Sequence, residues 1–217
     1  MKVPIESAVT LLHETPSATV ATLTTQLPGY PYATAVPCVV DQCHRPIFFI
    51  SALAEHTKNL LADPRASLSV VRAEGGNNIQ AAARATLVGD AEPIADPSPE
   101  LVARYLRYQP DAEEYLALDF MFFCLKPKLA RFIAGMGRMG WIESEEWELP
   151  SLPLKEEAAL LRKATIEAPR GIRLLGVDCF GIDYEIDGMR ARQRFPDAPL
   201  LPEKLGAVLL RVVSKLH

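Results

Sequence analysis

The chain has 217 residues, of which 49% are hydrophobic, and it carries a formal net charge of −4. This length suffices for one large domain or for one domain with a smaller companion, and the apolar fraction suffices for a substantial core. The acidic balance argues against a nucleic-acid partner, which would require a clustered basic surface. No stretch approaches the roughly 20 apolar residues of a spanning helix, and the first residues show no secretory signal, so we expect a cytoplasmic protein without a membrane partner.

The N-terminal two thirds of the sequence is dominated by strand patterns. Residues 5–14 place apolar side chains at helical spacing and predict an opening amphipathic helix. Pro37 inside the second strand indicates an edge strand, a bulge or a point where the hydrogen-bond ladder opens, and Gly89 is expected to end the fifth strand. Further helices are expected after the third strand and over 99–108, where Ser98 is the N-cap, with helical structure extending over 111–118. The expected strands are 19–25, 32–41, 46–51, 66–72 and 81–88, followed by a hairpin of 120–126 and 128–134.

The C-terminal part has its own pattern, beyond a linker around Pro150 and Pro153. Asp-Gly is a preferred two-residue turn, so Asp187-Gly188 predicts a hairpin that pairs Glu185 with Arg190 and Asp183 with Arg192. Such cross-strand charge pairs stabilise by ~0.2–1 kcal/mol each. A module of about 60 residues is marginal alone, so we expect it to dock on the barrel or on a second subunit. The other expected elements are a helix over 154–163, a strand over 173–177 and a helix over 205–216.

The four cysteines form no CxxC pair and lie mostly in apolar runs, which indicates buried thiols, neither a disulfide frame nor a zinc site. They are Cys38, Cys43, Cys124 and Cys179. We therefore predict no metal centre from them.

The junction between the third strand and its short helix is the strongest candidate binding site. Ser51 ends the strand, and His56, Thr57 and Lys58 open the helix. A helix N-terminus offers free N–H groups and partial positive charge, both of which suit an anion. The alternative is that a hydroxyl merely caps the helix while Lys58 lies in water. No glycine-rich dinucleotide loop is present, so the anion would be the terminal phosphate of a mononucleotide.

The motifs YATAVP, FFIS, HTKNL, DPRASL and RATLVGDAE, in this order, resemble the flavin-binding split-barrel superfamily of pyridoxamine 5′-phosphate oxidase. The similarity covers roughly residues 5–145 and is closer to the haem-utilisation (HugZ-like) branch. It implies an α+β fold: a six-stranded antiparallel Greek-key split β-barrel with peripheral helices, plus a small C-terminal α+β module. It also implies a homodimer with FMN at the subunit interface. The domains would be 1–148 and 149–217.

The resemblance also implies site residues. Ser51, Thr57 and Lys58 would hold the FMN phosphate with His56 beside them, while the backbone at Thr34 and its two successors would line the flavin ring. Arg84 would reach the ring or its ribityl chain, or would be a surface arginine. Tyr32 stands where the oxidase has a basic residue. The full set of expected FMN contacts is Thr34, Ala35, Val36, Ser51, His56, Thr57, Lys58 and Arg84.

Three classes of function follow. The first is an FMN-dependent oxidoreductase acting on an unidentified small molecule, for which no catalytic residue can be named. The second is a haem-binding or haem-degrading protein on the same barrel, and the third is a non-catalytic dimeric module. His13 and His44 are expected to be structural or exposed, and His217 to be a frayed end. Arg131 and Arg138 would approach the site across the dimer, and Trp141 is expected to be a packed aromatic.

Overall fold

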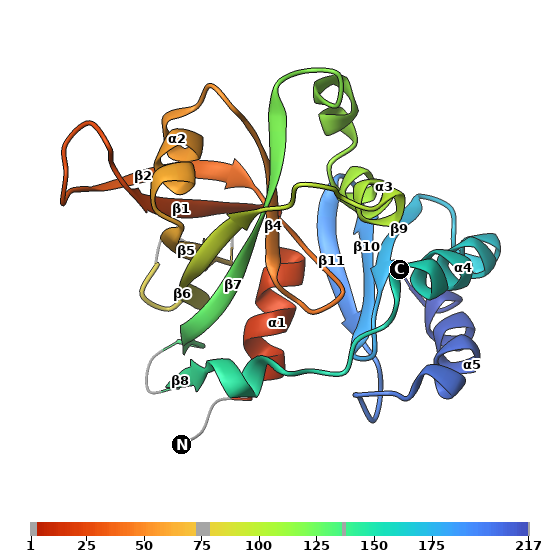
Figure 1. The fold of residues 1–217 in the computed structure, drawn as a ribbon. Helices are drawn as coiled ribbons and strands as arrows, with labels where there is room; N and C mark the ends of the chain where they lie inside the picture. Colours follow the sequence, from red (N-terminus) through yellow and green to blue (C-terminus); the bar gives the residue numbers. More distant parts are fainter. Residues whose placement is uncertain (1–3, 73–78, 136–137, 217) are drawn as a thin grey trace.

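Two antiparallel β-sheets with flanking helices make up the chain, for which a computed structural model describes residues 4–72, 79–135 and 138–216 (Figure 1). The larger sheet has the strand order β2-β1-β5-β6-β7-β4-β3, and β8 pairs with β7. The α+β split barrel is thereby confirmed. The expected strand 32–41 is divided into β2 and the short β3, and the short strand β8 was not expected. The bounds are β1 (Ser17–Leu23), β2 (Pro31–Pro37), β3 (Val39–Val40), β4 (Pro46–Ser51), β5 (Arg65–Val71), β6 (Arg84–Pro93), β7 (Phe120–Ile133) and β8 (Met139–Glu143).

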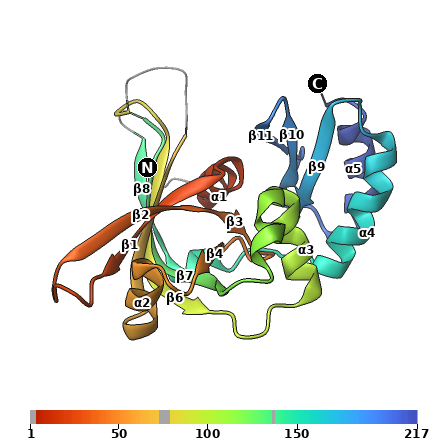
Figure 2. The same ribbon diagram turned by 90° about the horizontal axis from the view of Figure 1, so that it is seen from above.

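The helices of the barrel fall largely where the periodicity places them. Helix α3 begins as expected, since the Ser98 side chain accepts a hydrogen bond from the Leu101 N–H. Helices α1 and α3 lie between the barrel and the second sheet (Figures 1 and 2). The bounds are α1 (Ile5–Glu14), α2 (Glu55–Ala62), α3 (Pro99–Tyr108), and the short 3₁₀ segments η1 (Pro110–Tyr115) and η2 (Ser144–Trp147).

The barrel core forms because strands β1 and β5 alternate buried and more exposed positions, and the buried positions are mostly apolar. Val20 and Leu68 face each other across this pair and are fully buried. Strand β4 is apolar on both faces, because the barrel covers one face and α3 covers the other. Phe48 stacks with Phe123 inside the barrel, whereas Phe49 meets Tyr105 of α3 edge-on. Burial of such rings stabilises the barrel.

The expected hairpin of 120–126 and 128–134 is wrong: these residues form the single strand β7. The expected strand end at Gly89 is also wrong, because Gly89 lies inside β6. The pairing register shifts between Val88 and Gly89, opposite Pro127. A Cβ on Gly89 would lie 2.0 Å from the Lys126 carbonyl oxygen. The glycine and the proline therefore mark a bulge within paired strands rather than strand ends. Pro37 was expected inside a strand of residues 32–41 and is instead the last residue of β2, which is an edge strand of the sheet.

The C-terminal module consists of a three-stranded sheet, order β11-β10-β9, covered on one face by two helices (Figure 1). Asp187 and Gly188 both adopt positive φ, and the register pairs Glu185 with Arg190 and Asp183 with Arg192, which confirms the predicted hairpin. Glu185 nevertheless forms its ion pair with Arg173. The bounds are α4 (Leu154–Ala164), η3 (Thr165–Glu167), β9 (Ile172–Val177), β10 (Gly181–Ile186), β11 (Met189–Arg194) and α5 (Pro202–Val213).

An apolar seam joins the module to the barrel. Leu175 of the module belongs to the same buried cluster as Phe49 of the barrel and Tyr108 of α3. At Gly176 a Cβ would lie 2.0 Å from the Tyr108 hydroxyl, so the close approach requires glycine. The module thus docks on its own barrel, one of the two expected partners. No helix among the described residues has the length and apolarity to cross a bilayer.

Candidate functional site

The strand-to-helix junction is built as a tight turn between β4 and α2. Thr57 is buried, and its Oγ1 donates to the Ser51 carbonyl oxygen at 2.6 Å. The Ser51 Oγ accepts from the Leu53 N–H at 3.2 Å. The N-cap residue of α2, Ala54, has no side chain that could satisfy the first-turn N–H groups. The structure thus brings the two hydroxyls together but uses both of them within the turn.

Lys58 lies on the outer side of this turn. Its Nζ is 2.8 Å from Glu55 Oε1, and its side chain is 52% exposed. Glu55 occupies the first turn of α2, where its negative charge is favoured, and it also accepts from Gln26 Nε2. A phosphate at this helix end would have to draw Lys58 away from Glu55 and would lie beside a carboxylate. The role of Ser51, Thr57 and Lys58 toward FMN stays a prediction.

A cavity of about 440 Å³ lies next to the junction and contains four of the predicted residues: Ala35, Val36, Ser51 and His56. Its other walls are strongly aromatic and come from β4, α3, η1 and β7, with Phe49, Tyr105, Tyr115 and Phe120. The rings of Tyr115 and Phe120 stack with centroids 4.8 Å apart. Such a cavity suits a flat, apolar ligand better than a small polar one.

His56 is the one imidazole that lines this cavity within the described residues. Its Nε2 is buried and has no hydrogen-bond partner. Burial lowers the pKa of His56, so the ring is neutral at neutral pH. A neutral imidazole with an uncommitted nitrogen can act as a metal ligand, for example to haem iron. The aromatic walls and His56 thus offer groups that an iron porphyrin could use, and Nε2, which is buried, would have to turn into the cavity to reach the iron.

The remaining predicted contacts lie elsewhere. Thr34 is on β2 but does not line the cavity. Arg84 Nη1 donates to the carbonyl oxygens of Ile79 and Gln80, so it braces the turn before β6. Trp141 is 54% exposed rather than packed, with the Arg131 guanidinium 4.9 Å from its ring centroid. Whether Thr34 and Arg84 contact a flavin stays a prediction.

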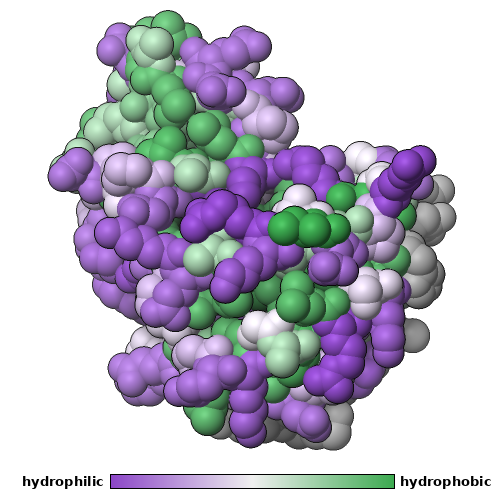
Figure 3. Space-filling model, turned by 90° about the vertical axis from the view of Figure 1, so that its right-hand side faces the viewer, coloured by the Kyte–Doolittle hydropathy of each residue, from purple (hydrophilic) through white to green (hydrophobic). Residues whose placement is uncertain are grey.

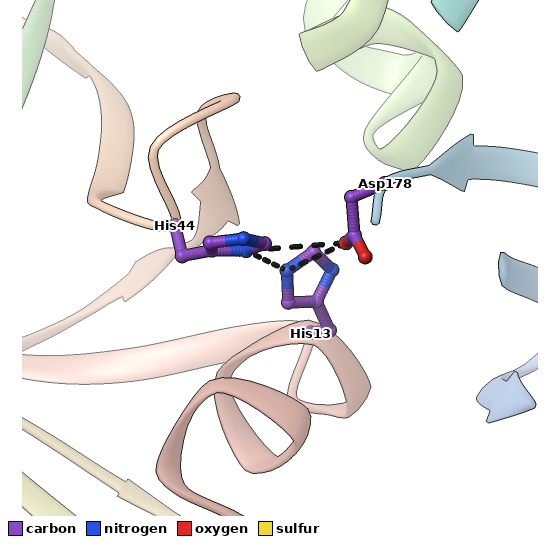
Figure 4. Close-up of side chains that lie close together, drawn as sticks. All are labelled: His13, His44 and Asp178. Atoms are coloured by element: carbon purple, nitrogen blue, oxygen red, sulfur yellow. Dashed lines mark hydrogen bonds and ion pairs between the residues drawn. The ribbon is translucent and has the colours of Figure 1, made fainter. Parts of the chain in front are cut away.

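A buried polar cluster between barrel and module was not anticipated. His13 and His44 are both fully buried, so the expectation of a structural role holds and that of an exposed one does not. His13 Nδ1 lies 2.5 Å from Asp183 Oδ2, which makes it the protonated nitrogen, and His13 Nε2 accepts from His44 Nδ1 at 2.9 Å. His13 comes from α1, His44 from the β3–β4 turn and Asp178 from the β9–β10 turn (Figure 4).

Arg192 supplies the positive charge of this cluster. It donates to both oxygens of Asp178 at 2.7 and 2.8 Å and to Asp183 Oδ1 at 2.6 Å. Burial alone would raise the pKa of Asp178, but the Arg192 guanidinium overrides that effect and lowers it to about 2. Burial lowers the pKa of His13 and that of His44, the latter to about 3, so both imidazoles are neutral. The ion pairs of Arg192 therefore lie within the module, and the neutral His13 joins this charged group to the barrel through its contact with Asp183.

His13, His44 and Asp178 place one potential ligand atom each close enough together for a metal ion. The donor chemistry does not favour one. The facing nitrogens of the two histidines are hydrogen-bonded to each other at 2.9 Å, and both oxygens of Asp178 are engaged by the Arg192 cation. A dication would have to break these bonds and sit beside a guanidinium. We assign the cluster to docking of the module.

A signal for this cluster exists in the sequence. His13 shares a helix face with Val9 and Leu12, so a hydrogen-bonded partner for a buried imidazole was required. The hairpin register also placed Asp183 opposite Arg192. Nothing in the local sequence shows that His13 contacts the Asp183–Arg192 pair, because His13 and Asp183 are 170 residues apart in the chain.

Comparisons with known proteins agree with this architecture. Residues 5–134 match the family model described as pyridoxamine 5′-phosphate oxidase. The non-canonical haem oxygenase HOZ of Arabidopsis thaliana chloroplasts is 32% identical over 134 residues, which are 61% of this chain and 41% of that protein. The match thus spans about two fifths of the curated relative.

Two solved structures resemble the whole chain. A protein of unknown function from Agrobacterium tumefaciens has a TM-score of 0.76 and 25% identity, over 95% of this chain and 94% of the other. A haem-binding protein from Mycobacterium smegmatis has a TM-score of 0.63 and 27% identity, over 99% and 98% of the two chains. The likeness therefore extends beyond the barrel to the C-terminal module.

Proposed function

Because the chain belongs to the pyridoxamine 5′-phosphate oxidase family, within its haem-utilisation (HugZ-like) branch, we propose that the cavity beside β4 and α2 binds haem. The observation that carries the proposal is His56, whose buried Nε2 has no partner and whose neutral ring lines an aromatic cavity. The names of two relatives, a haem oxygenase and a haem-binding protein, support the same ligand.

Different residues of the cavity would contact different parts of the haem. His56 would hold the iron through Nε2, and the rings of Phe49, Tyr115 and Phe120 would bury the apolar macrocycle. When bound, the haem iron supplies redox chemistry, while the chain binds and orients the group and keeps water away from it. Haem degradation, by analogy with the plant relative, would be a further step on the same site.

FMN is the second candidate ligand. It is favoured by the uncapped start of α2, where Ser51 and Thr57 are in contact and Lys58 is the next residue, and by the family to which the chain belongs. In this case Lys58 would leave its ion pair with Glu55 and bind the FMN phosphate. The protein would then be an oxidoreductase acting on a small molecule.

A homodimer is part of either proposal. Strand β2 lies at one edge of the large sheet, and most of its side chains are exposed, including Tyr32. Tyr30, directly before β2, is 61% exposed and adds apolar surface at this edge. Such a surface is typical of an interface, and a second copy would cover it together with the adjoining cavity. Light scattering of the purified protein measures the mass directly.

The test is a titration of purified protein with haemin and, separately, with FMN. We expect a Soret band with haemin that weakens at least ~10-fold in affinity in His56→Ala. Leu61→Ala, on an exposed position of α2, is the matched control and should bind like wild type. An unchanged Soret band in His56→Ala would show that the iron lies elsewhere. FMN binding that depends on Lys58, tested with Lys58→Ala, would favour the second candidate.

A further inference from the structure

The C-terminal module contains a second cavity, separate from the proposed haem site. Its volume is about 830 Å³, compared with about 440 Å³ beside α2. One wall is helix α5, and the other is the end of β11 with the segment up to Leu201. Figure 3 faces the side of the molecule that carries α4 and α5, where apolar residues lie exposed among hydrophilic ones.

Helix α5 has two apolar faces that the core of the module buries to different extents. Leu205, Leu209 and Val213 are fully buried in the module. Val208 and Val212 lie on the neighbouring face, are half-buried and line the cavity. Across from them, Leu201 is 63% exposed at the cavity wall. The cavity therefore has an apolar surface that the folded module leaves partly in contact with water.

The rim of this cavity is basic in a chain that is acidic overall. Lys204 and Arg211 of α5, Arg194 of β11 and Lys215 line it, and Asp197 is the one acidic residue beside them. Within the described part of the chain, none of Lys204, Arg211 and Arg194 forms an ion pair with a carboxylate, since the ion pairs involve other residues. Concentrated positive charge of this kind attracts an anion.

The walls also exclude some ligand classes. No aromatic side chain lines this cavity among the described residues, so a flavin, a porphyrin or a nucleobase finds no ring to stack on. An inorganic anion would leave the leucine and valine surface unused. The combination of aliphatic walls and a basic rim suits a molecule with a flexible aliphatic chain and an acidic head.

We propose that this cavity binds a long-chain carboxylic acid. The aliphatic chain lies against Leu201, Val208 and Val212, and the carboxylate is held by Lys204, Arg211 and Arg194. This site is independent of the haem proposal, because it shares no residue with the cavity that contains His56.

The experiment is calorimetric titration of the full chain with oleate, kept below its aggregation concentration, and with oleyl alcohol as the uncharged analogue. We expect oleate to bind and oleyl alcohol to bind at least ~10-fold more weakly, since the alcohol lacks the charge. Lys204→Glu with Arg211→Glu should weaken oleate at least ~10-fold. Arg162→Glu makes the same kind of charge change on an exposed position of α4 and should bind oleate like wild type.

Three results would overturn the proposal. One is the absence of oleate binding. Another is equal affinity for acid and alcohol, which would indicate non-specific apolar adsorption. The last is oleate binding that survives the double charge reversal, which would place the ligand elsewhere on the molecule. His56→Ala separates the two sites, because it should remove haem binding and leave oleate binding unchanged.

Discussion

Acidification should weaken the fold through His44, and the size of the effect can be worked out. A histidine in an unfolded chain has a pKa of ~6.5, whereas burial lowers the pKa of folded His44 to about 3. Below pH 6.5 the unfolded chain therefore binds a proton that the folded chain cannot hold. Stability is fully present above this pH and is lost as the pH falls toward 3. Between pH 7 and pH 5 the loss amounts to ~2 kcal/mol from this residue alone.

Asn is the substitution that removes the titration with least disturbance. His44 has a φ of 59°, a left-handed conformation that Asn tolerates well, and the Asn amide can donate to His13 Nε2 in place of His44 Nδ1. The groups that face His44, namely His13, Asp178, Arg192 and Arg104, are retained. Any general loss of stability cancels, because each protein is compared with itself at two pH values.

The assay is urea denaturation at pH 7 and pH 5, followed by the fluorescence of the two tryptophans. Wild type should lose ~2 kcal/mol more than His44→Asn between the two pH values. Titrating groups that do not contact His44 contribute equally to both proteins, and the Asn amide retains the hydrogen bond to His13. If the two proteins lose the same free energy over this range, His44 is not held neutral by burial and the reasoning is refuted.

The other predictions concern the buried charges and the bulge, and thermal or urea unfolding measures each of them. Arg192→Met should cost ~3–5 kcal/mol because it leaves two buried carboxylates without their cation, whereas Arg194→Met, on the exposed end of the same strand, should stay within ~0.5 kcal/mol of wild type. Equal losses of stability in Arg192→Met and Arg194→Met would mean that Asp178 and Asp183 are solvated. Gly89→Ala should destabilise, because its Cβ would meet the Lys126 carbonyl oxygen, while Gly206→Ala should be neutral or stabilise by up to ~1 kcal/mol in helix α5. A tolerated Gly89→Ala would show that the bulge relaxes.

Local structure was largely predictable, because it depends on neighbours in sequence. The 3.6-residue period of α1, the cap at Ser98 and the Asp187-Gly188 turn each act over a few residues, and all three appear as expected. The wrong strand predictions involve glycine and proline, which can either end a strand or form a bulge inside one. Gly89 and Pro127 usually interrupt a strand, yet opposite each other they form a bulge within paired strands.

At the candidate site, too, the sequence shows which residues are adjacent, and only the fold shows what each side chain contacts. The sequence places Ser51, His56, Thr57 and Lys58 at one strand-to-helix junction, because they are adjacent in the chain. It could not show that Thr57 turns inward to the Ser51 carbonyl, that Lys58 pairs with Glu55, or that His56 faces an aromatic cavity. The first two outcomes are local choices of side-chain direction within the turn and α2, whereas the cavity is built by α3, η1 and β7, whose residues lie far along the chain.

Periodicity, turn chemistry and the split-barrel motifs are properties of short stretches, and the amino-acid order alone was enough to establish them. The partners of buried polar groups were decided only by the packed molecule. His13 is hydrogen-bonded to Asp183, 170 residues away in the chain, and Arg192 donates to Asp178 on a neighbouring turn. The physical reason is that burial and pairing of charges depend on what surrounds a side chain in space, and elements distant in sequence supply those surroundings here.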